Sequence, residues 1–392
     1  MNKVKIFNAE VITPLEVIHN GTVLIDNGKI VCVTGGAIPT EDYMEIDAQG
    51  GYVSPGFIDI HTHGGGGFDF MDGTVEAYLG AAEAHARHGT TSLVPTTLTS
   101  TNEELKTSFR VFKEAKAQNK KGARLLGIHL EGPYFALAQK GAQDPRYIRN
   151  PKPGEYMEIL GQSDDILRWS AAPELEGALE FGRCLKSRGI LPSIAHSDAV
   201  DEDVFRAVES GYTHVTHLYS GMSGIRRINA YRFAGVIESA LLLDELTVEI
   251  IADGVHLPAS LLKLIYKVKG AGRIALVTDS MRAAGMPEGE YQLGSLKDGQ
   301  KVIVEDGVAK LPDRSAFAGS VATADRLVRT MTRIAGVPLV EAVRMITATP
   351  AAIIGLSDTK GSLIPGKDAD IILFDEDIDI KMSIIGGEIV CQ

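Results

Sequence analysis

The sequence predicts an α/β protein: an eight-stranded (β/α)8 barrel with a small β-sandwich domain built from both ends of the chain. From about residue 50 onward, eight short apolar or β-branched runs alternate with amphipathic helical stretches. The number of runs and the size of the region are those of a (β/α)8 barrel. An open, doubly wound sheet is the main alternative. It would need a Gly-rich dinucleotide turn after an early strand, and no G-x-G-x-x-G opens a helix here.

The eight predicted barrel strands are rich in β-branched and apolar residues, and regular helical spacing marks the stretches between them. The strands are Phe57–His61, Ser92–Thr96, Leu125–His129, Leu167–Ala171, Leu191–Ala195, Thr213–His217, Thr247–Ala252 and Ile274–Thr278. The clearest helices are Val75–His88, Asn102–Gln118, Leu175–Arg188 and Ala259–Val268.

Both ends of the chain carry short strand-like runs instead of helices. These runs are Lys3–Phe7, Thr22–Asp26 and Lys29–Val33 near the N-terminus, and Asp370–Asp375, Lys381–Ile385 and Glu388–Cys391 near the C-terminus. Asn27-Gly28 is a hairpin signal between two of them. We predict that residues 1–53 and 352–392 form one β-sandwich domain. Residues 54–351 are predicted to form the barrel, with a β insertion near residues 290–315.

Composition and charge exclude several classes of protein. Of the 392 residues, 44% are hydrophobic and 23% are charged, the usual balance of a globular protein in water. The formal charge of −12 argues against a nucleic-acid partner, which needs a basic face. An anionic substrate would therefore need a local group of Arg or Lys side chains.

Other classes are excluded by short-range features of the chain. No uncharged apolar run approaches the ~18 residues that span a bilayer, so we expect no membrane association. The N-terminus acquires an acid before any signal-like apolar block, and we expect a cytoplasmic protein. Three cysteines without a C-x-x-C pair offer neither a disulfide framework nor a thiolate zinc site.

Histidines collect where the predicted barrel strands end, and seven of the ten lie there. In a (β/α)8 barrel, reactive side chains gather at the carboxyl ends of the strands. The candidate residues at these ends are His61, His63, His129, Glu131, His196, His214, His217, Asp253, His256 and Asp279. His85 and His88 fall on a helix and His19 in the N-terminal segment, and we expect no function for these three.

Four of these histidines and one glutamate suggest a metal site. His61 and His63 are two residues apart on a strand, so their side chains point to the same face. Glu131 ends an apolar strand, where an unpaired carboxylate would be costly to bury. His196 and His217 follow at successive strand ends. One carboxylate and four imidazoles without a thiolate suit zinc or another first-row divalent ion, with one or two ions bound.

Asp279 closes the eighth predicted strand and is the candidate general base. An acid there faces the same axis as the metal ligands and could accept a proton from water activated by the ion, a contribution of about 10²–10⁴ in rate. The alternative is an N-cap for the following turn. His129 shares a face with Glu131 but lies one layer deeper, and His214 points to the other strand face, so we expect both to be structural.

Two loops near these strand ends carry further hypotheses. Gly64–Gly67 has no Gly-Lys-Ser/Thr after it, which favours a flexible substrate loop over a phosphate cradle. Arg226, Arg227 and Arg232 follow the sixth strand and form the basic group that an anionic substrate would need. A solvated loop is the alternative for these arginines.

The order of these motifs resembles a known family. Residues 55–64 (PGFIDIHTHG) are similar to the opening motif of the amidohydrolase superfamily, and residues 350–352 (PAA) with 361–370 (GSLIPGKDAD) to its closing motif. Within it, HLEGP at 129–133, AHS at 195–197, THLY at 216–219, DGVH at 253–256 and TD at 278–279 resemble the N-acetylglucosamine-6-phosphate deacetylase family. The resemblance covers nearly the whole chain, and HLEGP is specific to this branch.

The resemblance implies a barrel of the metal-dependent hydrolase type and roles for individual residues. Glu131, His196 and His217 would hold the catalytic metal, and His61 and His63 a second ion. Zinc is the first expectation, with iron, manganese, cobalt or nickel as alternatives. Asp279 would deprotonate the attacking water and then protonate the departing amine. The substrate contacts implied are Ala142, Gln143, Ser220, Gly221, Arg226, Arg227, Arg232, Asp253, His256, Phe317, Ala318 and Gly319.

The resemblance also implies a partner and leaves the substrate open. In the family, the loop after strand six reaches the phosphate in a neighbouring subunit, which implies a homodimer. The leading hypothesis is deacetylation of N-acetylglucosamine 6-phosphate to glucosamine 6-phosphate and acetate. Ser220-Gly221 replaces the usual Asn-Ala, and Arg232-Phe233-Ala234-Gly235 the usual R-E-P-G. N-acetylgalactosamine 6-phosphate or another acetylated amino sugar therefore remains an alternative. A catalytically inactive assembly protein is a further one, although no ligand histidine is lost.

Overall fold

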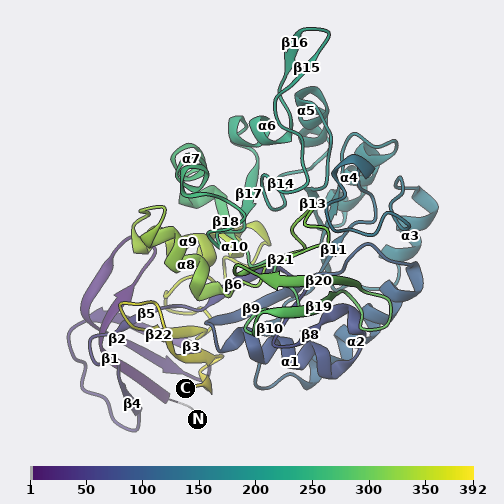
Figure 1. Cartoon of the computed structure of the whole chain (residues 1–392). Coiled ribbons are helices and arrows are strands. Elements are labelled where there is room, and N and C mark those ends of the chain that lie inside the picture. Colours follow the sequence, from purple (N-terminus) through teal and green to yellow (C-terminus); the bar gives the residue numbers. More distant parts are fainter. Residues whose placement is uncertain (1–2) are drawn as a thin grey trace.

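The protein is described by a computed structural model that covers residues 3–392. Parallel strands with helices between them form the larger part of the molecule (Figure 1). The strands are β6 (Phe57–Thr62), β9 (Thr90–Pro95), β10 (Arg124–Leu125), β11 (Ile128–Glu131), β12 (Ile166–Ala171), β13 (Leu191–Ile194), β14 (His214–Val215), β17 (Thr247–Ile250) and β18 (Ile274–Leu276). The helices are α1 (Val75–Ala86), α2 (Asn102–Gln118), α3 (Pro153–Leu160), α4 (Ala178–Ser187), α5 (Asp201–Glu209), α6 (Val236–Leu242), α7 (Ala259–Lys269), α8 (Ala324–Arg333), α9 (Leu339–Ile346) and α10 (Ala348–Ile353).

The parallel strands pair in chain order, as the barrel prediction requires. β6 pairs with β9 and β9 with β10, and a second parallel series consists of β11, β12, β13, β14, β17 and β18. A bridge between Thr96 and His129 joins the two series. The last strand returns to the first, because the Asp279 N–H donates to the His61 carbonyl (2.9 Å) and the His63 N–H to the Ser280 carbonyl (2.8 Å). One buried apolar cluster joins barrel strands to helix α10 and consists of Ile58, Ile60, Val94, Ile251, Ala275, Val277 and Ala351.

The third barrel strand was predicted as one run, Leu125–His129, and this is wrong. The structure has two short strands, β10 and β11, separated by residues 126 and 127. β10 pairs with β9, whereas β11 pairs with β12 and keeps only a single bridge, His129 to Thr96, on the β9 side. The predicted strand is therefore interrupted between its two neighbours.

At or just after the ends of three predicted strands, one residue leaves the extended conformation. His196, His217 and Asp279 have φ angles of +45°, +29° and +44°. Left-handed backbone is uncommon for residues other than Gly and carries strain that clusters at functional sites. The ladder hydrogen bonds stop where these side chains turn toward the barrel axis.

The terminal segments form one eight-stranded sheet, in which purple and yellow strands lie side by side (Figure 1). Its strands are β1 (Lys3–Ile12), β2 (Val17–Asp26), β3 (Lys29–Gly35), β4 (Met44–Asp47), β5 (Tyr52–Pro55), β22 (Ile371–Phe374), β23 (Ile380–Ile385) and β24 (Glu388–Cys391). β5 pairs with β22, which joins the two ends of the chain. The expected pairing of the tails is present, but the hydrogen bonds connect all eight strands in a single sheet and not in two separate ones. The domain boundaries near residues 53 and 352 stay a prediction.

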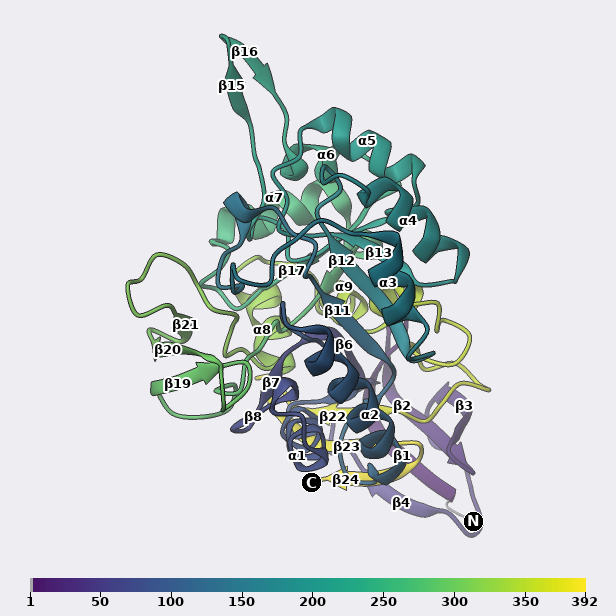
Figure 2. The same ribbon diagram turned by 90° about the vertical axis from the view of Figure 1, so that its right-hand side faces the viewer.

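Two insertions leave the barrel. β19 (Gly289–Leu293), β20 (Gln300–Glu305) and β21 (Val308–Lys310) form a small antiparallel sheet at the predicted insertion. β15 (Arg226–Ile228) and β16 (Tyr231–Phe233) form a hairpin that projects far from the body in both ribbon views (Figures 1 and 2). Within residues 3–392, no helix is both long and apolar enough to cross a membrane.

The Gly64–Gly67 run was expected to be a flexible substrate loop, and it is instead part of a tight ribbon. β7 (Gly64–Gly65) pairs with β8 (Phe68–Asp69). A Cβ at Gly64 would lie 2.1 Å from the Phe68 carbonyl oxygen, so only glycine fits. The run is absent from the lining of the cavity described below.

Helix α1 ties this ribbon to the barrel through His85, which was expected to have no function. Thr74 caps the helix by accepting from the Ala77 N–H (3.2 Å). The His85 ring is buried, and its Nε2 lies 3.1 Å from both the Gly64 carbonyl and the Thr62 hydroxyl. Burial lowers the pKa of His85 to about 4. The histidine is a neutral structural group beneath the strand end that carries His61 and His63.

The depressed pKa of His85 predicts an acid-sensitive contribution to stability. Below pH 6.5 the unfolded chain takes up a proton at this residue, whereas the folded protein does so only near pH 4. Between pH 7 and pH 4.5 the free energy of unfolding should fall by about 2–3 kcal/mol through this group. His85→Gln should lack that part of the pH dependence in denaturant unfolding. Equal losses in wild type and variant would contradict the assignment.

Candidate active site

A cavity of about 260 Å³ opens at the carboxyl ends of the barrel strands. It brings together segments that are far apart in the sequence. Its walls are His63, Leu98, Glu131, Gly141, Ala142, Gln143, His196, His217, Tyr219, Ser220, Gly221, His256, Asp279, Leu293, Ala316, Phe317 and Gly319. Most of the residues predicted for metal and substrate binding are in this set. Leu98, Gly141, Leu293 and Ala316 are lining residues that the sequence motifs did not single out, and Tyr219 is the last residue of the THLY motif.

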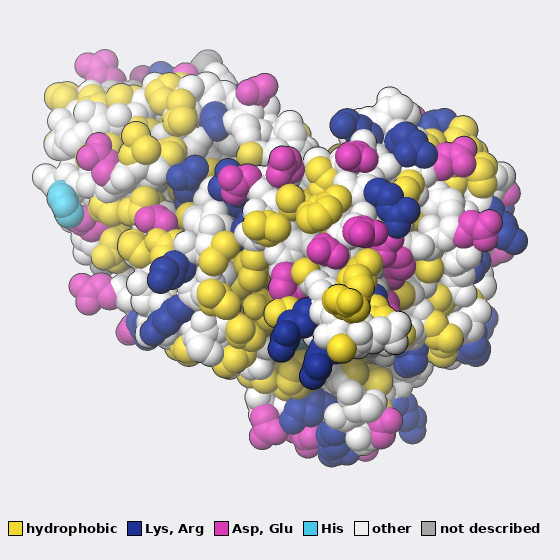
Figure 3. Space-filling view, turned by 90° about the horizontal axis from the view of Figure 1, so that it is seen from above, with side chains coloured by type: hydrophobic (Ala, Val, Ile, Leu, Met, Phe, Trp, Pro, Cys, Tyr) yellow, Lys and Arg dark blue, Asp and Glu magenta, His cyan; other side chains and the backbone are white. Residues whose placement is uncertain are grey.

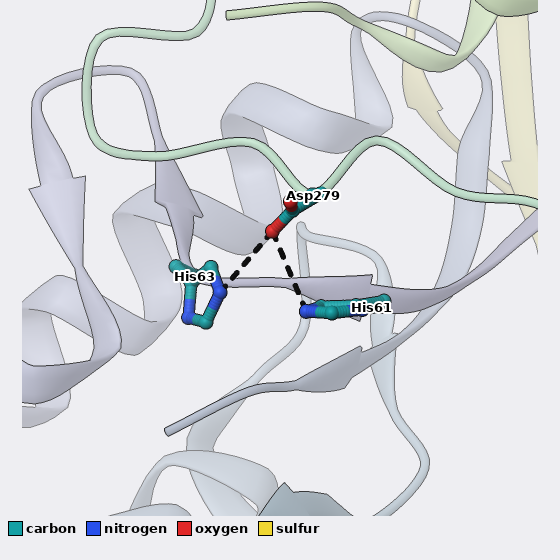
Figure 4. Close-up of side chains that lie close together, drawn as sticks. All are labelled: His61, His63 and Asp279. Atoms are coloured by element: carbon teal, nitrogen blue, oxygen red, sulfur yellow. Dashed lines mark ion pairs between the residues drawn. The ribbon is translucent and has the colours of Figure 1, made fainter. Parts of the chain in front are cut away.

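The predicted metal ligands form two adjacent groups of side chains. His61, His63 and Asp279 make one group, and Glu131, His196 and His217 the other. Within each group, the ligand atoms lie within 4.8 Å of one another. Figure 4 shows both imidazoles of the first group turned toward the Asp279 carboxylate, whose Oδ1 lies 3.4 Å from His61 Nε2 and 3.2 Å from His63 Nε2.

Glu131 belongs to the second group but also contacts the first, and all four histidines present Nε2 to it. Its Oε1 is 3.0 Å from His217, 3.5 Å from His196 and 3.5 Å from His61. Its Oε2 is 3.3 Å from His63. One buried carboxylate therefore faces four imidazoles, as the sequence suggested.

Three of the four imidazoles are oriented by a contact at the opposite ring nitrogen. The Nδ1 contacts are the Glu249 carboxylate for His61 (3.1 Å), the Thr96 carbonyl for His63 (3.2 Å) and the Gln139 carbonyl for His196 (2.8 Å). Since these oxygens only accept, each Nδ1 carries a proton, and Nε2 is the nitrogen left to bind a cation. Metal-binding histidines are typically held in this way.

The donor set fits a divalent cation. His61 Nε2 is buried without a hydrogen-bond partner in the described structure, although two carboxylates lie near it. Buried nitrogen atoms normally have partners, and a bound cation would provide one for this nitrogen. Nitrogen and oxygen donors without thiolate are those of zinc and similar ions.

The electrostatics of the site favour positive charge. Burial lowers the pKa of His61, but the charges of Asp279 and Glu131 outweigh burial and hold this pKa well above its ordinary value. Burial is likewise outweighed at His63, where the bonds to Asp279 and Glu131 raise the pKa to about 9. Burial raises the pKa of Asp279, yet the charge of His61 and the contact with His63 bring it below its usual range. Asp279 is therefore ionised at neutral pH and able to accept a proton.

Gln143 lies where the resemblance places a substrate contact, and an unpredicted residue fixes its amide. The Thr99 N–H and hydroxyl both donate to Gln143 Oε1 (2.9 Å each). Gln143 Nε2 is consequently directed at Glu131 Oε2 (2.7 Å). Thr99 follows a barrel strand without belonging to any motif, and no sequence signal marked it.

The predicted sugar-binding residues divide into lining and supporting ones. His256 lines the cavity beside Phe317, with ring centroids 4.7 Å apart. Asp253 does not reach the cavity; its carboxylate lies 2.8 Å from His256 Nδ1 and accepts from the His256 N–H. Ala318 is fully buried. Neither Asp253 nor Ala318 belongs to the cavity lining, and direct contact of either with a substrate stays a prediction.

Gly221 departs from the family motif for a local steric reason. It has a φ of +57°, and a Cβ there would lie 2.7 Å from His196 Nδ1. A glycine is needed for the backbone to pass so close to this ring. Gly221 and Ser220 both line the cavity.

The three predicted phosphate-binding arginines do not lie in the cavity of their own chain. Arg226 is bound to Asp198, with Nη1 2.8 Å from its carboxylate. Arg227 and Arg232 are exposed and directly opposite each other on the β15–β16 hairpin. Figure 3 looks down on the end of the molecule from which this hairpin projects, and basic side chains lie there beside a hydrophobic group. No Lys or Arg among the described residues lines the cavity.

Comparisons with known proteins agree with this architecture. The sequence model of the amidohydrolase family matches residues 52–390. The chain belongs to the amidohydrolase family. It is 35% identical to the N-acetylglucosamine-6-phosphate deacetylase of Bacillus subtilis over 385 residues, 97% of this chain and 95% of that protein. It is 34% identical to the N-acetylgalactosamine-6-phosphate deacetylase of Escherichia coli over 347 residues, 88% of this chain and 89% of that protein.

Solved structures show the same relationship. A mutant N-acetyl-D-glucosamine-6-phosphate deacetylase from Mycobacterium smegmatis, in complex with N-acetyl-D-glucosamine-6-phosphate, matches with a TM-score of 0.91 and 30% identity over 100% of both chains. The fold is that of the amidohydrolase superfamily, of the TIM-barrel type. The resemblance to the N-acetylglucosamine-6-phosphate deacetylases that the sequence motifs suggested is confirmed.

The central position of Glu131 predicts the effect of removing it. Glu131→Ala should leave the purified protein with substantially less bound divalent metal, because the carboxylate lies within 3.5 Å of all four histidines. Elemental analysis of wild type and variant measures this. His256→Ala, which changes the same cavity outside the two groups, is the matched control and should keep its metal. Equal metal content in wild type and Glu131→Ala would contradict the role.

Proposed function

We propose that this protein hydrolyses the acetamide of N-acetylglucosamine 6-phosphate, giving glucosamine 6-phosphate and acetate. One observation supports this most strongly: Asp279 lies beside His61 and His63 at the wall of a cavity that also exposes Glu131, His196 and His217. Relatives named for this deacetylation cover nearly the whole chain. The arrangement suits hydrolysis of an amide by activated water.

The proposed chemistry divides between an ion and the side chains around it. The ligand groups would hold one or two divalent ions, with zinc the best match to the donors, and such an ion lowers the pKa of water and polarises a carbonyl. Asp279 takes a proton from the attacking water and later gives one to the departing amine. The fixed amide of Gln143 keeps its second N–H for the substrate.

The rest of the cavity provides the sugar subsite. His256, oriented by Asp253, would hydrogen-bond the hexose through Nε2, while Phe317 covers an apolar edge of the ring. Ser220, Gly221 and Gly319 complete the wall near the metal ligands. These contacts favour a small polar molecule over a polymer.

The phosphate would be bound by a second copy of the chain. Arg227 and Arg232 stand opposite each other at the hairpin, and like charges in such a pair are destabilising unless an anion lies between them. The hairpin also exposes Ile228 and Tyr231 (75% exposed), which a partner would cover. We therefore propose a homodimer in which each hairpin reaches the other active site. A cytoplasmic location remains our expectation.

N-acetylgalactosamine 6-phosphate is the second candidate substrate. The Escherichia coli relative named for this epimer is 34% identical, close to the 35% of the Bacillus subtilis protein. Ser220-Gly221, where the family usually has Asn-Ala, lines the cavity and could alter the fit of the sugar. An inactive assembly protein is disfavoured because both ligand groups are complete.

Acetate release tests the function directly. The metal-loaded protein should release acetate from N-acetylglucosamine 6-phosphate, and Asp279→Asn should fold normally but turn over at least about 100-fold more slowly, since it cannot take up the proton. The specificity constants for the glucosamine and galactosamine epimers decide between the two substrates. Unchanged turnover in Asp279→Asn would show that another group is the base.

The proposed phosphate subsite makes a separate prediction. Arg227→Ala and Arg232→Ala should raise KM for the phosphorylated sugar by about tenfold or more each, because a charge-assisted hydrogen bond contributes about 1.5–3 kcal/mol. The kcat of each variant should change little. Arg110→Ala, on the exposed surface of α2, is the control. Equal KM values for phosphorylated and unphosphorylated sugar in the wild type would contradict a phosphate role for the hairpin.

A further inference from the structure

A buried ion pair lies inside the barrel beneath the metal ligands, and no motif of the family pointed to it. Arg168 on β12 and Glu249 on β17 are both fully buried, and the Arg168 guanidinium contacts the Glu249 carboxylate. Burying two charges costs several kcal/mol per ion, and apolar residues of similar volume are often at least as stable. Stability alone does not account for the pair, and its other contacts indicate a further role.

The second oxygen of Glu249 is directed at a metal ligand. Glu249 Oε2 lies 3.1 Å from His61 Nδ1 and accepts from the backbone N–H of His217 (3.3 Å). The first oxygen is engaged by Arg168 and lies 3.2 Å from His214 Nε2. A carboxylate so deeply buried and charged accepts only, which requires a proton on His61 Nδ1. Nε2, the atom that faces Asp279 and Glu131, is then the nitrogen left to bind an ion.

Arg168 fixes Glu249 and the chain next to both ligands. Its guanidinium donates to the carbonyl of Ile60 (3.2 Å), the residue before His61. It also donates to the hydroxyl of Thr216 (2.9 Å), the residue before His217. The ion pair therefore touches one member of each ligand group, but only in the His61 group does it contact a ligand side chain.

We propose that Glu249, held by Arg168, is a positioning residue for His61: it fixes the ring as the Nδ1–H tautomer with Nε2 toward Asp279 and Glu131. It thereby tunes the affinity of the His61, His63 and Asp279 group for a divalent ion. The proposal rests on the two-ion form of the proposed function. It goes beyond the proposed function because Glu249, which would contact neither the ion nor the substrate, helps to set the affinity for the ion.

Two double variants isolate the acceptor at position 249 without leaving a lone buried charge. Both carry Arg168→Met; one adds Glu249→Leu, which removes the acceptor, and the other adds Glu249→Gln, whose Oε1 can still accept from His61 Nδ1–H. The metal-free proteins are titrated with Zn²⁺ in competition with a chelator. Lys360→Met/Asp370→Leu, which removes another buried ion pair away from the ligands, is the control.

We expect the Leu variant to bind the second Zn²⁺ about 10–100-fold more weakly, the usual effect of losing such an acceptor. The Gln variant and the control should stay close to the wild type. Equal second-site affinity in the Leu and Gln variants would overturn the role of Glu249 and leave the proposed function intact. A wild type that binds only one Zn²⁺ would overturn the two-ion arrangement, and this inference with it.

A measurement on the unmodified protein keeps the test independent of variant folding. In protein labelled with ¹⁵N-histidine and loaded with Zn²⁺, the His61 signal, assigned by its loss in His61→Gln, should show a protonated Nδ1. A proton on Nε2 of His61, or rapid exchange between the two tautomers, would overturn the proposal.

Discussion

The structure depends on one buried carboxylate. Glu131 lies on the axis of the barrel with two oxygens facing four imidazoles and one amide. A carboxylate in such a position is unfavourable unless positive charge surrounds it. Burial raises the pKa of Glu131, but the charge of His61 and the contacts with His196 and His217 hold it well below its ordinary value. The need for positive charge around Glu131 explains why four histidines surround it. It also explains why the site below the cavity suits a cation.

The backbone shows how the barrel delivers these side chains. His196, His217 and Asp279 all leave their strands in left-handed conformations that non-glycine residues avoid. In each case the strand stops within a few residues, and the side chain turns to the centre of the cavity. The regular strands hold the backbone rigidly up to their ends. The strained left-handed residues then direct their side chains into the cavity.

Much of the site could be predicted from sequence because the information is local. In a barrel, a histidine at the carboxyl end of an apolar strand is expected at the face that carries the reactive residues, so His61, His63, His196 and His217 were recognisable. The alternation of strands and helices was also predictable from the local hydrophobic pattern. The third strand was misread because its pairing is interrupted at residues 126 and 127, and such an interruption leaves no mark on hydrophobic periodicity.

The residues that orient the ligands were not predictable. Thr99, Gln139 and Glu249 act on atoms far away in sequence, and each is unremarkable within its own segment. Arg226 was grouped with Arg227 and Arg232 by proximity, yet its bond to Asp198 separates it from them. Such relationships depend on which segments the fold brings together, which spacing within one segment cannot show.

The junction between β5 and β22 has a consequence for how the protein is made. β5 runs almost directly into β6, the strand that carries His61, and its pairing partner β22 comes from residues 371–374. During synthesis on a ribosome, the first metal-binding strand therefore lacks this anchor until residues 371–374 have emerged. A truncation that removes β22, or a bulky fusion after it, would therefore disturb β6, the strand that carries His61.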